Sequence, residues 1–259
     1  MTSTAERASA LLALHTDPAL LTLVNVWDVA SARVVAQTPG TTAIATASHA
    51  IAAMYGYQDG EHIPRGLMLE AVGRVVDAVD LPVTADLEAG YGDAAETVRR
   101  AIGLGVAGCN IEDQLKPLAE ATAVVESVMR AAEAEGVPDF VLNARTDAFL
   151  RAGDRDPDAV LADAIERGRA FLDAGAPVVF VPGALSEDQV IALVEAFGPQ
   201  RLTMLPVPGG PSLPRLQELG VARVSFGPFP HRVALTALQE MVEGVARGEG
   251  IPAGTRTLT

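Results

Sequence analysis

Acidic side chains and one arginine stand where three successive apolar runs of the sequence end. Asp86 and Glu88 follow the first of these runs. Glu112 ends the second, and Arg145 ends the third. Carboxylate oxygens suit a hard cation such as Mg²⁺, which prefers few carboxylates and several waters. A neighbouring arginine can grip a substrate carboxylate with both arms of its guanidinium group. These residue types predict metal-assisted chemistry on a small organic acid that develops enolate character.

Carboxylates at strand ends have a second common use, because they cap the helix that follows. Asp93 fills this role before AAETV, and we expect Asp28 to cap the helix of VASARVV. A lone Asp-x-Glu pair is therefore weak support for a metal site. Three carboxylates and an arginine on consecutive strands favour metal binding over helix capping as the role of these carboxylates. Cys109 lies within its apolar run, so we expect a core residue.

Eight short apolar runs alternate with helix-like stretches rich in Ala, Leu, Glu and Arg. The runs are nearly continuous in apolar character, which is typical of parallel strands buried on both faces. They lie at 21–26, 41–46, 81–86, 107–112, 139–144, 176–181, 201–206 and 221–226. Helical spacing is found at 66–79, 94–104, 120–135, 157–173, 186–197, 212–219 and 229–246.

This alternation predicts a (β/α)8 TIM barrel, with residues 1–259 as one domain and about 247–259 as a flexible tail. A doubly wound open sheet would need a glycine-rich turn after its first strand, and NVWDVASARV has none. In a barrel the carboxyl ends of all strands meet at one mouth. The fold therefore brings the carboxylates and Arg145 together.

The net charge of the chain excludes some classes of binding partner. A formal net charge of −14 argues against nucleic acid and against an anionic membrane surface. No apolar run approaches the ~20 residues that span a bilayer, and the N-terminal segment reads as an amphipathic helix rather than a signal peptide. A single cysteine suits a reducing compartment. We expect a cytoplasmic enzyme with a small-molecule substrate.

Five motifs resemble the isocitrate lyase / phosphoenolpyruvate mutase superfamily, and they keep the order of that family from about residue 20 to 235. They are NVWDVASARVV (25–35), GYQDGE (56–61), ADLEAGYG (85–92), GCNIEDQ (108–114) and NARTDAF (143–149). The resemblance implies a (β/α)8 barrel with a C-terminal helix swapped between subunits, in a homodimer or homotetramer. It also implies Mg²⁺, with Mn²⁺ as the alternative, and a substrate with an α-oxycarboxylate group.

The resemblance also implies roles for individual residues. Asp86 resembles the direct metal ligand, and Asp59, Glu88 and Glu112 resemble residues that hold the metal through water. Arg145 resembles the arginine that binds the substrate carboxylate. Ala47 and Ser48 fall where backbone amides of the family receive that carboxylate, and Asn143 and Asp86 complete the predicted substrate contacts.

The chain departs from the family at the proton donor. The lyase branch carries a KKCGH segment with a catalytic cysteine, and the stretch EDQLKPLAEAT stands here instead. The mutase and phosphonate-hydrolase branch carries Lys and Asn, where this chain has Leu118 and Glu120. A general acid must come from elsewhere, and His49 and Tyr91 are the candidates, together with Arg145 as a catalytic residue.

The prediction is a Mg²⁺-dependent carbon–carbon lyase or decarboxylase. Its substrate would be a small 2-oxo or 2-hydroxy (di)carboxylic acid, and its electrons would flow into a metal-stabilised enolate. Two alternatives remain open at this stage: a phosphonopyruvate-type hydrolase or mutase, and a barrel that binds a dicarboxylate without turning it over.

Overall fold

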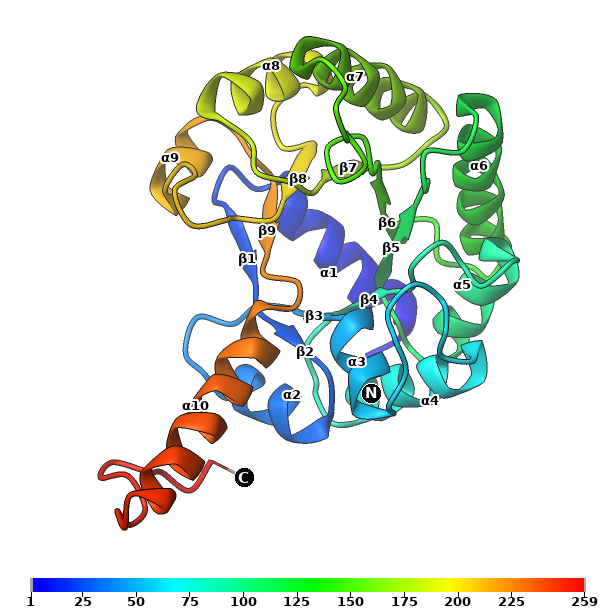
Figure 1. The fold of residues 1–259 in the computed structure, drawn as a ribbon. Coiled ribbons are helices and arrows are strands. Elements are labelled where there is room, and N and C mark those ends of the chain that lie inside the picture. Colours follow the sequence, from blue (N-terminus) through cyan, green and yellow to red (C-terminus); the bar gives the residue numbers. More distant parts are fainter. Residues whose placement is uncertain (1, 259) are drawn as a thin grey trace.

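The computed structural model describes residues 2–258. Its centre is a ring of parallel strands (Figure 1), in the order β1-β9-β8-β7-β6-β5-β4-β3-β2. The strands are β1 Leu21–Leu23, β2 Asn25–Val26, β3 Ile44–Thr46, β4 Val83–Asp86, β5 Gly108–Glu112, β6 Val141–Arg145, β7 Val178–Val181, β8 Leu202–Met204 and β9 Arg223–Ser225.

The predicted run at 21–26 is one barrel stave in two pieces. Only Val24 separates β1 from β2. β1 pairs with β9, whereas β2 pairs with β3. Val24 therefore marks the point where this strand of the barrel stops pairing with one neighbour and begins pairing with the other. The two pieces together close the ring, and the (β/α)8 TIM barrel is confirmed.

Helices surround the ring and follow the strands in alternation (Figure 1). They are α1 Thr4–Thr16, α2 Val29–Ala36, α3 Ser48–Met54, α4 Arg65–Asp77, α5 Ala94–Gly103, α6 Leu118–Ala134, α7 Pro157–Asp173, α8 Glu187–Phe197, α9 Leu213–Glu218 and α10 Phe229–Ala246. The predicted helices appear within a few residues of their expected ends.

Side-chain caps begin several helices where the sequence predicts them. Asp28 accepts a hydrogen bond from the Ser31 amide in a capping box, so its expected role as a cap is confirmed. Asp93 accepts from the Glu96 amide at the start of α5. Both carboxylates are thereby accounted for by local structure.

Helix α1 closes the barrel mouth opposite the carboxyl ends of the strands, and Figure 1 shows it crossing the centre of the ring. Gly108 begins β5, and a Cβ built there would approach Leu11 of α1 to 3.0 Å. The glycine therefore lets the helix pack directly on the strand. Cys109 is fully buried beside it, as expected for a core residue.

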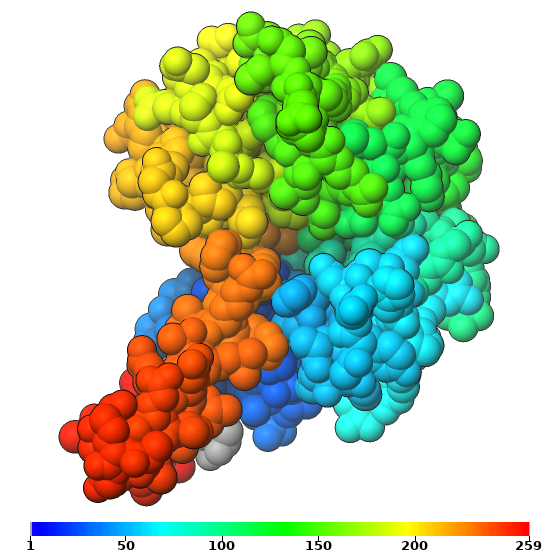
Figure 2. All heavy atoms as spheres, in the orientation of Figure 1, coloured from blue at the N-terminus to red at the C-terminus, as the bar shows by residue number. Residues whose placement is uncertain are grey.

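Helix α10 projects from the barrel as an arm (Figures 1 and 2). Five of its large apolar side chains are half exposed or more, namely Val233, Leu235, Leu238, Val242 and Val245. Within residues 2–258, no helix combines the length and the apolar composition that crossing a bilayer requires.

Candidate active site

A cavity of about 270 Å³ opens where the strands end. Its polar lining comes from Asn25, Ser48, His49, Asp59, Asp86, Asn110, Arg145, Ser225 and Arg232. Its apolar lining comes from Ala47, Leu150, Phe180, Pro182, Leu205 and Pro228, with Gly227. Most of these residues lie at or just beyond the carboxyl end of a strand, which is where barrel enzymes place their chemistry.

Asp86 ends β4, and the first turn of α3 holds it in place. Its Oδ2 accepts hydrogen bonds from the Ser48 hydroxyl at 2.7 Å and the Ser48 amide at 3.1 Å. The Asp86 amide in turn donates to the Thr46 hydroxyl oxygen at 3.0 Å. No group within residues 2–258 donates to Oδ1. One oxygen is thus anchored, and the other is available to a ligand.

A second cavity of about 330 Å³ adjoins the first and shares Ser48, Asp59, Arg145 and Leu150 with it. Glu88 and Glu112 line this second cavity. The structure therefore gathers the four predicted metal-site carboxylates around two adjoining hollows at one mouth.

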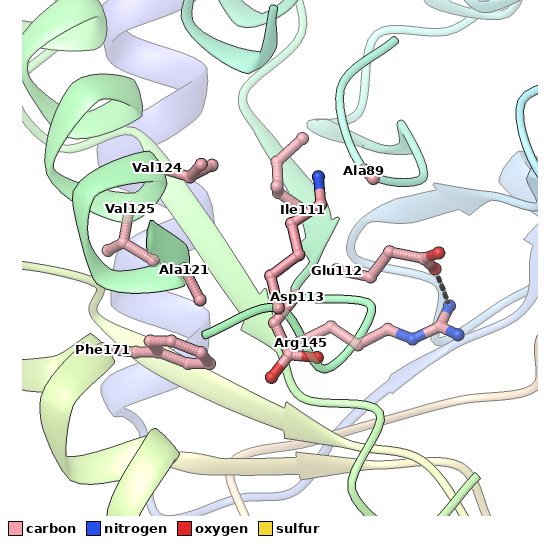
Figure 3. A pocket seen from close by; sticks show the side chains of 10 residues that line it. Ala89, Ile111, Glu112, Asp113, Ala121, Val124, Val125, Arg145 and Phe171 are labelled. Atoms are coloured by element: carbon pink, nitrogen blue, oxygen red, sulfur yellow. Dashed lines mark ion pairs between the residues drawn. The ribbon is translucent and has the colours of Figure 1, made fainter. Parts of the chain in front are cut away.

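Arg145 lies between two carboxylates. Its Nη1 is 2.8 Å from Glu112 Oε2, and its Nε donates to Asp147 Oδ1 at 2.8 Å. Figure 3 shows Glu112 and Arg145 pointing toward one another, with a small apolar cavity behind them that Ala121, Val125 and Phe171 help to line. Burial by itself lowers the pKa of Arg145, but Glu112 and Asp147 raise it overall, so the guanidinium stays charged. The ion pairs fix the direction in which the cation faces the cavity.

Glu112 is an unusual carboxylate. Burial, and then the negative charges of Asp147, Asp86 and Glu88, raise the pKa of Glu112 to about 7. The nearby positive charge of Arg145 lowers this pKa, but by less than the other effects raise it. Crowded buried carboxylates disfavour one another's ionisation. Around Glu112 the carboxylates therefore outnumber Arg145, the cation that pairs with it.

Glu88 makes contacts that the sequence does not reveal. Its Oε1 accepts from the Tyr91 hydroxyl at 2.7 Å, and its Oε2 accepts from the Glu61 amide. Glu61 in turn accepts from the Tyr91 amide. All three residues have positive φ angles, between 53° and 63°, a conformation that costs non-glycine residues about 1 kcal/mol or more. These hydrogen bonds hold the loop between α3 and α4, which carries Asp59 and Glu61, against the end of β4.

Tyr91 lies away from both cavities. Its hydroxyl points to Glu88, and burial, followed by that hydrogen bond, raises the pKa of Tyr91 well above its ordinary value. Asn143 is also withdrawn, since it is fully buried beneath the cavity. It donates to Asn110 at 2.8 Å and accepts from Thr203 at 2.6 Å, so it orients the Asn110 side chain that lines the cavity.

His49 lines the first cavity with its ring 3.7 Å from Asp59 Oδ2. About 41% of its side chain is exposed. An imidazole at this position is within reach of a molecule bound in the cavity. The Ala47 amide bonds to the Val26 carbonyl at 3.1 Å, and the Ser48 amide bonds to Asp86. Both amides predicted to receive a carboxylate have protein partners here.

The donor set fits Mg²⁺ better than a transition metal. Within residues 2–258, no three Asp, Glu, His or Cys side chains converge closely enough to enclose a metal ion. Magnesium needs only one or two protein carboxylates and keeps its waters. The available oxygen of Asp86 and the excess negative charge around Glu112 suit one direct ligand, with the other carboxylates acting through water.

Several cavity residues escape the sequence reasoning. Asn110 stands two residues before Glu112 on β5, so strand alternation could have found it. Arg232 follows His231 in the first turn of α10, and its place at the cavity depends on how that helix leaves the barrel. The ring of His231 itself packs at a tilt against the ring of Trp27, with the ring centroids 4.9 Å apart.

Comparisons with known proteins agree with this fold. The family model of phosphoenolpyruvate phosphomutase matches residues 11–246. The chain is 31% identical to 2-methylisocitrate lyase of Escherichia coli over 71% of its length and 65% of the relative. It is 40% identical to a putative phosphonomutase from Burkholderia cenocepacia, covering 93% and 99% of the two chains with a TM-score of 0.87. Oxaloacetate acetylhydrolase bound to 3,3-difluorooxalacetate is 26% identical, with 99% and 92% covered and a TM-score of 0.85.

Proposed function

Because the chain belongs to the phosphoenolpyruvate phosphomutase family and is an enzyme of the isocitrate lyase / phosphoenolpyruvate mutase type, we propose a specific activity for it. It is a Mg²⁺-dependent lyase or decarboxylase that cleaves a carbon–carbon bond in a small 2-oxo or 2-hydroxy dicarboxylic acid. Relatives named for 2-hydroxy acids with two or three carboxylates, 2,3-dimethylmalate lyase and 2-methylisocitrate lyase, support this substrate class.

One observation carries the proposal: Asp86, with an available oxygen, and Arg145, held by two carboxylates, line the same small cavity. A bound divalent cation would supply positive charge beside the reacting end of the substrate. Arg145 binds the carboxylate at that end, and Ser48 keeps Asp86 turned toward the cavity. Both groups are in place before the substrate arrives, which favours electrostatic stabilisation of the charge that develops.

His49 is the proposed proton donor. It lies in the cavity, whereas the hydroxyl of Tyr91 is bonded to Glu88. A proton on His49 would pass to the carbanionic carbon after bond cleavage, and the Asp59 carboxylate would orient the ring. Apolar side chains such as Phe180 and Leu205 keep bulk water from that carbon.

The test is a panel of 2-oxo and 2-hydroxy acids incubated with the purified protein and Mg²⁺, with release of pyruvate, glyoxylate, oxalate or CO₂ as the readout. We expect turnover that EDTA abolishes and that Asp86→Ala lowers by about 10²-fold or more. Asp80→Ala is the matched control, because Asp80 is exposed and precedes the same strand at its other end. Wild-type turnover in EDTA or in Asp86→Ala would refute the mechanism.

Phosphonate chemistry is the second candidate, and the similarity to a putative phosphonomutase favours it. Lys116 is the base nearest to the place where that branch carries a lysine, but it lines the small cavity beside β5 and α6 and neither of the two larger cavities at the mouth. Phosphonopyruvate therefore belongs in the panel, and phosphate release would revive this function. Stabilisation by oxalate and Mg²⁺ without turnover of any acid would instead identify a binding barrel.

The arm formed by α10 supports the proposal of a homo-oligomer in which this helix is swapped between subunits. Leu235, Leu238, Val242 and Val245 recur at three- and four-residue spacing and are 50–57% exposed. Burying such a face stabilises an interface by ~25 cal/mol per Å² of apolar surface. Light scattering should give a dimer or tetramer, and Leu238→Asp should yield monomers. A monomeric wild-type protein would contradict the proposal. The cytoplasm remains the expected location.

A further inference from the structure

Arg232 is a second arginine at the same cavity, and it has no role in the proposed mechanism. It lies in the first turn of α10 and lines the cavity together with Asp86, Ser48 and Arg145. It forms no ion pair with any residue of 2–258. Its guanidinium carbon lies 5.6 Å from the centroid of the Phe229 ring, a cation–π contact that leaves the hydrogen-bond donors unused.

The fold puts Arg232 and Arg145 on different sides of the mouth. Arg145 ends β6, whereas Arg232 follows β9, and β7 and β8 stand between these strands in the ring. Phe180, Leu205 and Pro228 line the wall on that arc. These three residues carry no side-chain hydrogen-bond donor, so on this arc the side-chain donors that line the cavity are the two arginines and the Ser225 hydroxyl at the end of β9.

The turn that carries Arg232 is held by the barrel itself. Asn25 of β2 lines the cavity, and its Oδ1 accepts hydrogen bonds from the amides of Phe226 and Gly227 at 2.7 and 2.8 Å. Its amide group donates to the Thr46 carbonyl at 2.8 Å. The start of α10 is thereby fixed relative to the strands, and the cation is presented at a defined edge of the cavity.

We propose that Arg232 binds the distal carboxylate of the substrate and determines the preference for dicarboxylic over monocarboxylic acids. This inference rests on the proposed function, since it assumes that the other carboxylate lies at Arg145 and Asp86. A cation without an ion pair, on an apolar arc of a small cavity, matches an anionic group at the far end of an elongated ligand.

Binding of two probes tests the inference apart from turnover. Malate and 2-hydroxybutyrate have the same four-carbon chain, and a methyl group replaces the distal carboxylate in the second. Calorimetry in the presence of Mg²⁺ should show tighter binding of malate by wild type. Arg232→Met should lose about tenfold to a hundredfold in malate affinity, the value of a charge-assisted hydrogen bond, and little for 2-hydroxybutyrate. Arg232→Lys should retain part of the preference.

Arg247→Met is the matched control, because Arg247 stands at the other end of α10 and pairs with Glu249. It should bind both acids as wild type does. A wild-type protein that binds both acids equally, or binds neither, would overturn the inference. So would an Arg232→Met variant that keeps the preference or weakens both acids alike. If malate binds as expected but no acid in the panel is turned over, the proposed function fails while the role of Arg232 stands.

Discussion

His15 should make the barrel sensitive to mild acid. It lies in the last turn of α1, fully buried, with Nδ1 2.8 Å from the Leu11 carbonyl and Nε2 without a partner within residues 2–258. Burial, and then the positive charge of Arg223, lower the pKa of His15 to about 3, although the bond to Leu11 opposes the shift. The folded protein therefore requires the neutral ring.

The size of the effect follows from linkage. The pKa is about 6.5 in the unfolded chain and about 3 in the folded one, so between these values the unfolded state binds the proton more readily. The contribution of the neutral His15 ring to the free energy of unfolding is fully present above pH 6.5. It is lost as the pH falls toward 3, at ~1.4 kcal/mol for each pH unit. Between pH 7 and pH 5 the loss is about 2 kcal/mol.

Urea unfolding of wild type and His15→Gln at pH 7 and pH 5 measures this loss. The glutamine amide can still donate to the Leu11 carbonyl but cannot take up a proton. We expect the free energy of unfolding of wild type to fall by about 2 kcal/mol more than that of the variant. His62→Gln, at an exposed position, should behave as wild type. Equal losses in wild type and His15→Gln, or an NMR titration of His15 near pH 6.5, would refute the reasoning.

Two further predictions concern packing and buried charge. In Gly168→Ala a methyl group would collide with the ring of Phe197, so we expect a loss of about 1–3 kcal/mol in urea unfolding. A methyl group added at Gly103 would contact nothing within 4 Å. Gly103→Ala should therefore leave stability unchanged or raise it by up to about 1 kcal/mol. Equal effects of the two substitutions would contradict the packing argument. Arg223 is buried with its three side-chain nitrogens unpartnered within residues 2–258, and burial lowers its pKa to about 10 despite the attraction of Asp86. Arg223→Met should therefore raise the unfolding free energy by about 1–3 kcal/mol, and a clear loss would show that the charge is satisfied in the folded protein.

Local pattern was sufficient to predict the barrel. Runs such as 176–181 are apolar at nearly every position, which only a strand buried on both faces tolerates. Because parallel strands end at one mouth, placing Asp86, Glu112 and Arg145 together needed no knowledge of their contacts. The caps at Asp28 and Asp93 were equally readable, since a cap bonds within three residues of itself.

What each side chain does at the mouth depended on contacts between distant residues. Glu88 was predicted from the sequence to contact the metal through water, and only the structure shows that the Glu61 amide and the Tyr91 hydroxyl also bond to its two oxygens. Asn143 looked like a substrate contact, but its strand places it one layer below, where it holds Asn110.

The sequence by itself determined the fold, the mouth at which the acidic groups and Arg145 gather, and the family. Periodicity and strand polarity are local properties, and they suffice for the fold and the mouth, whereas the family rests on the resemblance of five sequence motifs. Only the tertiary structure decided which oxygen of Asp86 is anchored by Ser48 and which cation lines the cavity opposite Arg145. These depend on the directions of side chains brought together from 38 or more residues apart, and such directions are set by packing rather than by pattern.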